Sequence, residues 1–326
     1  MVDFKIGEYT LKPFTIESKP LMEDYLKDVE SSLSDYSFVA NFIWLANSSG
    51  FYAIIHDTFA LFILNGGELS MLLPPLGKLE YINNAIIECF KIMNTNNSSK
   101  YLSRIDYVDE YYMKYFVHNV EELEIYEILE HYLIEKRMAD YVYNIDDLIE
   151  LRGNSYHSKR TEINKFQKVY PNYATELLDP ETHGHEIIEL FNRWVMKRMA
   201  YMPKVELDAF LDGLNYERFA IKRILKYYHK LDLIGMILRI DGNIVGFTIG
   251  ERHNETTSTI LIEKTEFEIL GSAQFIFKMF CAMLKEHYGS LYINAGDDMG
   301  FENLKKVKLS YRPAKLLPKY TIYQKD

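Results

Sequence analysis

The sequence predicts a mixed α/β protein that is built from two comparable halves. Its 326 residues are enough for two domains of ordinary size. In each half, hydrophobic spacing and turn residues predict the same order of elements: helices, three antiparallel strands, a helix, a strand and a helix. We therefore expect a duplicated unit, with one domain over residues 1–138 and a second over residues 139–326. The alternative is an accidental match, because a strand meander followed by a helix is a common pattern.

The first half opens with a predicted helix over residues 18–31, which starts at Ser18 and has acidic residues in its early turns. Residues 35–45 are apolar and aromatic, and their pattern fits either a helix or a strand. Turn residues such as Gly66-Gly67 then separate three strand-like runs, which predicts an antiparallel meander. These runs cover residues 51–55, 59–64 and 68–73.

A long helix follows the meander. The helix is predicted over residues 79–93, because helical spacing puts four apolar side chains on one face, namely Ile82, Ile86, Phe90 and Met93. The remaining elements predicted in this half are a strand over residues 101–107, a short helix over 109–118 and an acidic helix over 121–138.

The second half repeats the order with sharper signals. Asp241-Gly242-Asn243 is a strong hairpin turn, because these residue types tolerate positive φ. Predicted helices cover residues 146–166 with a break at Gly153-Asn154, 185–199, 220–231, 271–288 and 301–310. Predicted strands cover residues 141–143, 233–240, 244–251, 257–264, 291–294 and 319–323.

Charge and composition restrict the class of function. The net charge of −10 disfavours nucleic-acid binding through bulk electrostatics, although residues 302–319 carry six basic residues and one acid. No Cys/His spacing resembles a zinc site, so we expect no metal. Cys89 and Cys281 lie in apolar segments that are typical of buried thiols in a reducing compartment. Neither a secretory signal nor an apolar run of the ~20 residues that span a membrane is visible, so the expected location is the cytoplasm.

The segment before the helix at 271–288 has the residue types of a donor-binding loop. Gly271 and Ala273 are small enough for backbone N–H groups to approach a pyrophosphate at a helix N-terminus, and Ser272 could cap the helix or donate its hydroxyl. In position and residue types this segment resembles the Gln/Arg-x-x-Gly-x-Gly/Ala loop of the GNAT acyltransferase superfamily. Glu268 departs from that pattern, because a carboxylate near a pyrophosphate is unfavourable. The structural alternative is a tight turn in which glycine serves packing.

Polar residues on the two neighbouring strands predict a cleft. We expect the strand that carries Glu263 to splay from the strand at 291–294, with Asn294 at the mouth of the resulting cleft among the cofactor-binding residues. Asp297 or Glu263 could accept a proton from an amine, and the alternative for Asp297 is an N-cap of the next helix. Tyr311 is a candidate proton donor by resemblance to the same superfamily.

Two basic runs are candidates for substrate binding. In the first, His157, Lys159 and Arg160 follow the Gly-Asn break and could form a phosphate clamp. In the second, Lys308 and Lys315 belong to the basic run of residues 302–319, which could bind phosphates of a cofactor, a tRNA acceptor end or an anionic lipid headgroup. The alternatives are a structural histidine and a solvated helix face.

These runs also carry a family resemblance. The segment Tyr156–Phe166, together with residues 34–38 and 308–313, resembles an uncharacterised bacterial family that shares its domain with the C-terminal part of phosphatidylglycerol lysyltransferases. The resemblance covers nearly the whole chain. It implies an α/β fold of tandem GNAT-like domains, each a mixed, mostly antiparallel sheet flanked by helices, similar also to Fem-type aminoacyltransferases. Unlike the lysyltransferases, this chain shows no many-helix membrane domain.

The resemblance implies an acyl- or aminoacyl-transferase. The activated acyl group would come from acyl-CoA or aminoacyl-tRNA and would move to an amine or hydroxyl acceptor. The alternative is a catalytically degenerate binding module for a phosphate-bearing ligand, which Glu268 favours. Donor, acceptor and oligomeric state stay open at this level.

Overall fold

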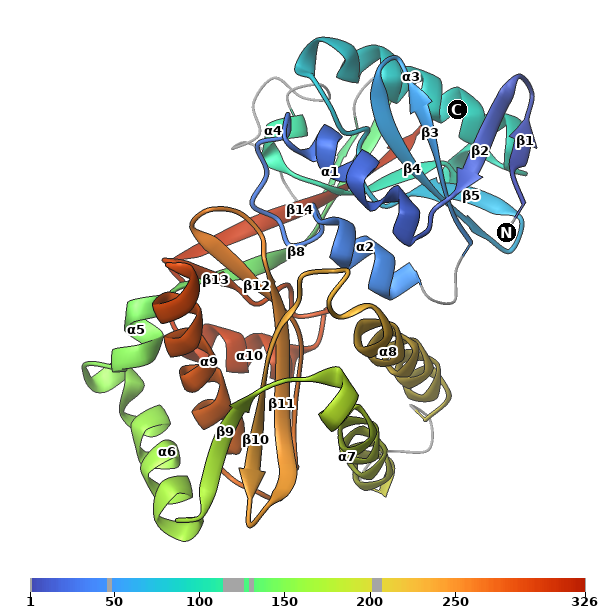
Figure 1. The fold of residues 1–326 in the computed structure, drawn as a ribbon. Helices are drawn as coiled ribbons and strands as arrows, with labels where there is room; N and C mark the ends of the chain where they lie inside the picture. Colours follow the sequence, from blue (N-terminus) through green and yellow to red (C-terminus); the bar gives the residue numbers. More distant parts are fainter. Residues whose placement is uncertain (1, 46–48, 114–125, 129–131, 201–206, 326) are drawn as a thin grey trace. The chain divides into compact units, whose positions relative to one another are not determined.

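A computed structural model describes the chain except for residues 1, 46–48, 114–125, 129–131, 201–206 and 326 (Figure 1). The chain forms two compact units, one of Met1–Asp140 with Leu317–Asp326 and the other of Tyr141–Leu316. The C-terminal segment belongs to the first unit because strand β14 (Lys315–Gln324) pairs there with β6 (Arg104–Val108). The division into domains at residue 138 stays a prediction.

The first unit is a mostly antiparallel sheet with helices. Its strands follow the order β1-β2-β3-β4-β5-β6-β14-β8, and β5 and β6, which helix α3 connects, are parallel. The further strands are β1 (Phe4–Ile6), β2 (Tyr9–Pro13), β3 (Ser49–Ile55), β4 (Thr58–Asn65), β5 (Glu68–Met71), β7 (Tyr126–Ile128) and β8 (Tyr132–Asn144). The helices are α1 (Lys19–Leu26), α2 (Phe38–Trp44), α3 (Leu79–Asn96) and α4 (Glu110–Met113).

The meander of this unit agrees with the sequence analysis. His56, Asp57, Gly66 and Gly67 have positive φ and make the two turns between β3, β4 and β5. The four apolar side chains predicted to share one face of α3 are all buried. Local periodicity was sufficient to predict these three strands, because each pairs with the strand next to it in the sequence.

The acidic helix predicted over residues 121–138 is wrong. Within this range the described residues form β7 and the start of β8, and residues 121–125 and 129–131 lie outside the described residues. Glu and Leu favour a helix locally, but β8 pairs with β7, and its Ile134 side chain is buried. The helix expected over 109–118 is described only as α4.

The first unit also holds a buried ion cluster. The Lys319 ammonium lies 2.5 Å from Asp35 Oδ2 and 2.8 Å from Asp140 Oδ1, and the backbone N–H of Ser34 donates to Asp140 at 2.6 Å. Lys319 is 1% exposed. Lys319 belongs by position to the basic run of residues 302–319, but because it is buried it adds no positive charge to the surface.

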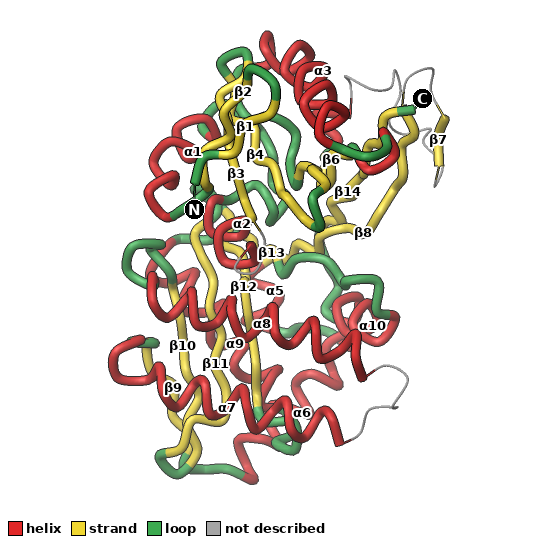
Figure 2. Tube along the Cα trace, turned by 90° about the vertical axis from the view of Figure 1, so that its right-hand side faces the viewer, coloured by secondary structure: helices red, strands yellow, loops and turns green. Residues whose placement is uncertain are grey.

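The second unit is a sheet of order β8-β13-β12-β11-β10-β9 with helices on both faces. Figure 1 shows α5, α6 and α9 on one face and α7 and α8 on the other, and Figure 2 shows α7 and α8 lying across the strands. The strands are β9 (Tyr173–Leu177), β10 (Ile234–Ile240), β11 (Asn243–Arg252), β12 (Thr257–Thr265) and β13 (Tyr292–Asn294). The helices are α5 (Ile145–Glu150), α6 (His157–Val169), α7 (Pro180–Ala200), α8 (Leu207–Tyr227), α9 (Ser272–Tyr288) and α10 (Glu302–Ser310).

The main core of this unit lies between the sheet and the helices α5, α6 and α9. Phe166, Phe280 and Ile293 are fully buried in it, as is Cys281, and Cys89 is buried in the other unit. In the part of the chain that the structure describes, no helix is both long and apolar enough to cross a bilayer.

Candidate functional site

Strands β12 and β13 separate after a short parallel pairing. They pair only where Thr257–Thr259 meets Tyr292–Asn294, after which β13 ends and β12 continues to Thr265. The other edge of β12 stays paired with β11. Among the described strands, none therefore pairs with one edge of the second half of β12. The predicted splay is present.

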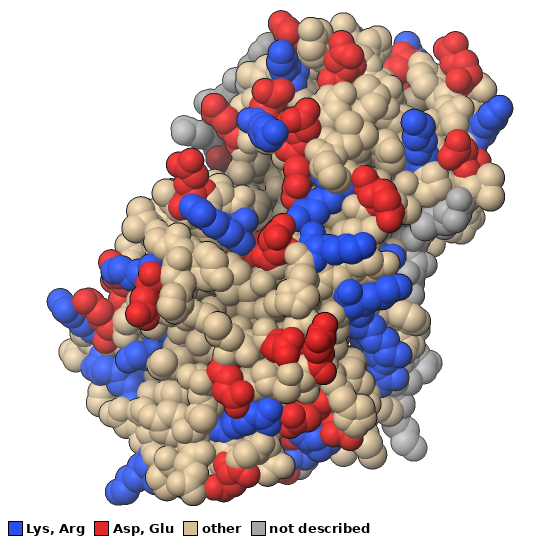
Figure 3. Space-filling model, viewed as in Figure 1, with Lys and Arg blue, Asp and Glu red and all other residues tan. Residues whose placement is uncertain are grey.

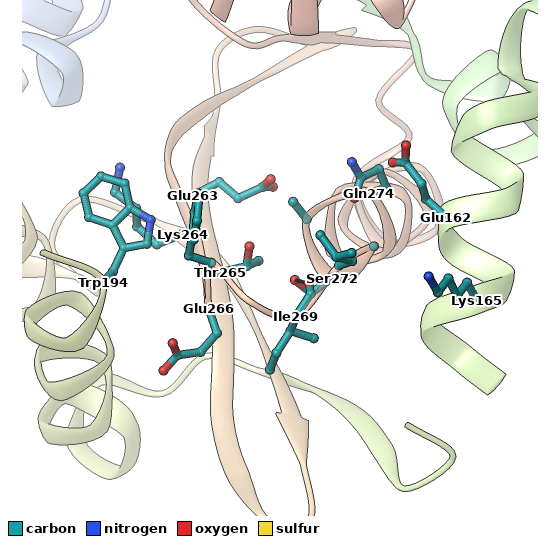
Figure 4. A pocket seen from close by; sticks show the side chains of 14 residues that line it. Glu162, Lys165, Trp194, Glu263, Lys264, Thr265, Glu266, Ile269, Ser272 and Gln274 are labelled. Atoms are coloured by element: carbon teal, nitrogen blue, oxygen red, sulfur yellow. Dashed lines mark hydrogen bonds between the residues drawn. The ribbon is translucent and has the colours of Figure 1, made fainter. Parts of the chain in front are cut away.

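A cavity of about 530 Å³ lies along this free edge. Side chains from β12, the following loop, the start of α9 and helices α6 and α7 line it (Figure 4). The lining residues are Glu162, Lys165, Trp194, Glu263, Lys264, Thr265, Glu266, Phe267, Ile269, Leu270, Gly271, Ser272, Ala273 and Gln274. Its volume suits a small-molecule group.

Gly271 brings the start of α9 against α6. Its φ is +87°, and a Cβ atom on it would lie 2.4 Å from the Glu162 carbonyl oxygen and 2.9 Å from Phe166 Cβ. The glycine is therefore required by close packing of the two helices, as the structural alternative stated.

The first turn of α9 opens toward the cavity. The Gly271 carbonyl accepts the first helical hydrogen bond, from Phe275 N at 3.0 Å, and the Ser272 hydroxyl turns back to donate to the Ile269 carbonyl at 2.6 Å. An α-helix leaves the N–H groups of its first turn without carbonyl partners inside the helix. Because Ala273 and Gln274 line the cavity, this end of α9 offers partial positive charge there.

Glu263 is the ionisable group with the most perturbed environment in the cavity. Figure 4 shows its carboxylate directed from β12 toward the start of α9, whereas Lys264 and Trp194 lie on the other side of the strand. Burial raises the pKa of Glu263 to about 8. The hydroxyl of Thr248, its cross-strand neighbour, and the charge of Lys264 lower the pKa and offset part of the effect of burial. A carboxyl group perturbed in this way inside a cavity is a candidate functional group.

Two further acids near the loop, Glu266 and Glu268, are paired. Glu268, which departs from the superfamily pattern, forms an ion pair with Lys197, with 2.8 Å between Oε2 and Nζ. Glu266 pairs with Arg193 at 2.7 Å and with the same lysine at 3.1 Å. These contacts draw the Glu268 carboxylate toward α7 and offset its charge, so this residue no longer argues against an anionic group at the loop.

A desolvated lysine packs beneath this region. Lys159 is 7% exposed, and its Nζ atom lies 4.3 Å from the centre of the Tyr311 ring. Burial lowers the pKa of Lys159. Burial, and then the charges of Glu263 and Glu162, raise the pKa of Tyr311 well above its ordinary value, so its hydroxyl stays protonated.

The profile of one protein family matches nearly all of this sequence. The family is described as phosphatidylglycerol lysyltransferase, C-terminal, and the match covers residues 26–323. The chain belongs to this family. Family and fold together fit an acyl- or aminoacyl-transferase, as the sequence analysis expected.

Solved structures confirm the tandem GNAT-like fold of this member of the phosphatidylglycerol lysyltransferase C-terminal family. A conserved protein of unknown function from Bacteroides thetaiotaomicron is 26% identical, with a TM-score of 0.78 and coverage of 97% of this chain and 99% of that chain. L-PGS from Bacillus licheniformis is 16% identical, with a TM-score of 0.65 and coverage of 99% and 95%. A tandem GNAT protein from the clavulanic acid biosynthesis pathway is 7% identical, with a TM-score of 0.52 and coverage of 96% and 98%. The latter two show similarity of fold.

A curated relative is also similar in sequence. An uncharacterized protein of Mycoplasmoides gallisepticum is 23% identical over 193 residues, which are 58% of this chain and 58% of that protein. The chain thus matches less than two thirds of that relative's length.

Of the residues predicted from sequence, the cavity gathers Glu263, Gly271, Ser272 and Ala273. Asn294 and Asp297 are not among its lining residues. Asn294 is buried and its side chain accepts from Gly296 N at 2.8 Å, while Asp297 accepts from Met299 N at 2.8 Å. Both side chains therefore shape the turn after β13.

Three of the predicted cations hold backbone loops or stack on rings. Arg160 donates to the carbonyls of Leu151 and Gly153 at the end of α5. Lys308 donates to three carbonyls, those of residues 295–297, and Lys315 lies 5.0 Å above the Tyr292 ring. His157 is exposed at the start of α6. The predicted basic runs therefore do not gather as one phosphate clamp.

Ten of the lining residues were not among the predicted site residues, and four of these ten lie on helices, namely Glu162, Lys165, Trp194 and Gln274. Glu162 and Lys165 lie one turn apart on α6, inside the segment that carried the family resemblance. That spacing was a usable signal. Trp194 could not be found from sequence, because α7 reaches the cavity only through packing on the sheet.

Proposed function

We propose that the protein transfers an activated aminoacyl or acyl group to an amine or hydroxyl acceptor, with the cavity at the start of α9 as the site of transfer. The observation that carries this proposal is Glu263, which points from the free edge of β12 into the cavity, toward the first turn of α9. A carboxyl group whose pKa is near 8 suits proton transfer at neutral pH.

The proposed step joins the acceptor to the acyl carbon. The amine or hydroxyl attacks the donor carbonyl, a bond to the acyl carbon forms, and the bond from that carbon to the leaving group breaks. Glu263 accepts the acceptor's proton and returns it to the leaving oxygen or sulfur. Backbone N–H groups at the start of α9, near Ala273 and Gln274, stabilise the oxyanion that develops on the carbonyl.

Among the two donor classes, the surroundings of the loop favour aminoacyl-tRNA over acyl-CoA. A pyrophosphate cradle at Gly271 would meet the Glu162 carbonyl oxygen, which backs the glycine. The walls also carry the carboxylate of Glu162, which attracts the ammonium group of an aminoacyl ester and repels a pyrophosphate. We assign Lys165, exposed at the cavity edge on α6, to contact with a donor phosphate.

Three predicted residues take supporting roles in this proposal. Tyr311 and Lys159 pack together beneath the cavity and hold α6 in place. Asp297 keeps the turn after β13 and takes no proton. We expect the reaction to occur in the cytoplasm, where charged tRNA is available.

The test is an acyl-transfer assay with Glu263→Gln. Purified wild type is incubated with charged tRNAs and, separately, with acyl-CoA esters, and loss of the donor ester is followed in the presence of amine and hydroxyl acceptors. We expect turnover of an aminoacyl-tRNA and a loss of about a hundredfold or more in the variant. The matched control is Glu286→Gln, an exposed residue near the far end of α9, which should keep wild-type activity.

Two outcomes would overturn the proposal. One is full activity of Glu263→Gln, which would remove the proposed base. The other is a wild-type protein that is thermally stabilised by a donor but turns over no acceptor, which would indicate a binding module.

A further inference from the structure

The loop between β12 and α9, residues 266–271, is attached to the rest of the unit on two sides. On one side, Gly271 packs against the backbone of α6. On the other, the Glu266 carboxylate lies between two cations of α7, with Arg193 Nε 2.7 Å from Oε1 and Lys197 Nζ 3.1 Å from Oε2. Arg193 also donates to the Ile244 carbonyl at 3.2 Å. Both oxygens of one carboxylate therefore hold the loop to α7, and Arg193 ties the same point to the start of β11.

The ion pairs of Glu266 differ from ordinary surface pairs. Figure 3 shows acidic and basic side chains next to one another at several places on the surface of the second unit. Exposed pairs of that kind add little to stability. The side chain of Glu266, in contrast, is only 9% exposed. A buried ion pair often adds less stability than an apolar contact of the same size, because both charges lose water. What such a pair can supply is a fixed arrangement of the groups that it joins.

A continuous series of hydrogen bonds leads from Glu266 to the first turn of α9. The Glu266 N–H donates to the Val245 carbonyl at 2.7 Å, and the Glu266 carbonyl accepts from Ile269 N at 3.1 Å. The Ile269 carbonyl accepts in turn from the N–H of Ser272 at 3.2 Å and from its hydroxyl at 2.6 Å. Ser272 is the first residue of α9, and this end of the helix lines the cavity. A shift of Glu266 would therefore be passed on to the start of α9.

We propose that Arg193 and Lys197 are positioning residues for the transfer step, and that they act through Glu266 on the start of α9. This inference rests on the proposed function, in which N–H groups of that turn stabilise the oxyanion. Such groups lose much of their effect when they are displaced by about 1 Å, so a loop that is already fixed in the free protein favours the reaction. Glu268 shares Lys197 as its partner, but its side chain is 64% exposed and should contribute little.

The test uses a variant of α7 that leaves the sequence of the loop unchanged. Arg193→Met with Lys197→Met, the α7 variant, removes both cations from Glu266. In the aminoacyl-transfer assay, kcat per folded molecule should fall by about 10–100-fold. The KM for the donor should stay within about threefold of wild type, because the oxyanion exists only in the transition state. The apparent pKa of the rate should stay near 8, since Glu263 lies on β12 and not on the loop.

Two matched controls separate the effect of charge from that of packing. Arg193→Lys with Lys197→Arg exchanges the two cations and keeps both charges, so its kcat should lie within about threefold of wild type. Glu268→Gln breaks only the exposed pair with Lys197 and should leave kcat unchanged. Urea unfolding of each variant gives the folded fraction to which kcat is referred.

Hydrogen–deuterium exchange tests the positioning of the loop without any substrate. The backbone amides of residues 267–275 should exchange about tenfold faster in the α7 variant than in wild type, with no change over the second half of α9. If wild type turns over no donor, the proposed function fails, whereas faster exchange confined to residues 267–275 still supports the role of the two cations in holding this loop.

Four results would overturn the proposal. They are a wild-type kcat in the α7 variant, a loss of kcat that the unfolded fraction explains completely, an equal loss in the variant that keeps both charges, and unchanged exchange at residues 267–275. The second result would leave Arg193 and Lys197 with a structural role alone.

Discussion

Ionisation of Glu263 should lower the stability of the folded protein as pH rises. Burial raises its pKa from an ordinary 4.5 to about 8, so between these values the folded protein binds a proton that the unfolded chain has released. The free energy of unfolding must therefore fall as pH rises across this window. Glu263→Gln removes this dependence, because its amide does not ionise.

The magnitude follows from the two pKa values. The gap between 4.5 and about 8 corresponds to roughly 5 kcal/mol above pH 8. Because the side chain is partly exposed to the cavity, water screens the charge, and we expect about 2–4 kcal/mol.

Urea unfolding of wild type and Glu263→Gln at pH values from 5 to 9 measures this difference. The two proteins should be similar in stability at pH 5, and the variant should be more stable by about 2–4 kcal/mol at pH 9. In the same range the transfer rate of wild type should rise with an apparent pKa near 8. Parallel stability curves of the two proteins would refute the assignment of a desolvated carboxyl group at this position.

Other substitutions test the packing around the cavity and in the first unit. Gly271→Ala should cost about 2–4 kcal/mol in urea unfolding, because its φ is positive and its Cβ would meet the α6 backbone; an unchanged midpoint would contradict this contact. Lys319→Met leaves the buried carboxylate of Asp140 and the half-buried one of Asp35 without their cation and should cost about 3–5 kcal/mol; a loss under 1 kcal/mol would show that water reaches the cluster. Lys159→Met should be neutral or stabilising in thermal unfolding, since the amine is desolvated, while Lys159→Glu should destabilise strongly; equal effects would exclude burial as the cause. Glu268→Gln breaks an exposed ion pair and should change stability by less than about 0.5 kcal/mol, with donor turnover retained.

Residues close in sequence determined most of the fold. The turn at Asp241-Gly242, the helix α9 and the repeated order of elements follow from spacing and turn residues that act within a few positions. The same information failed for residues 121–138 and gave no sign of β9. β9 pairs with the distant β10, and β8 lies between the distant strands β14 and β13 in the sheet, so pairing overrides local preference there.

For the site, the sequence alone supplied Glu263, the small residues before α9 and the expectation that β12 and β13 separate. The sequence could not show which Lys and Arg side chains bind other groups of the protein and which are available to a ligand. Arg160 and Lys308 hold carbonyls of loops, and Lys319 is buried between two carboxylates. The partners of Lys319 come from remote parts of the chain, whereas Arg160 and Lys308 bind carbonyls only 7 and 13 residues away. In each case the turns and packing of the folded chain bring the partners together, and the order of charges in the sequence does not identify them. Burial likewise depends on the packed structure, so only the tertiary structure decided which carboxylate has a raised pKa.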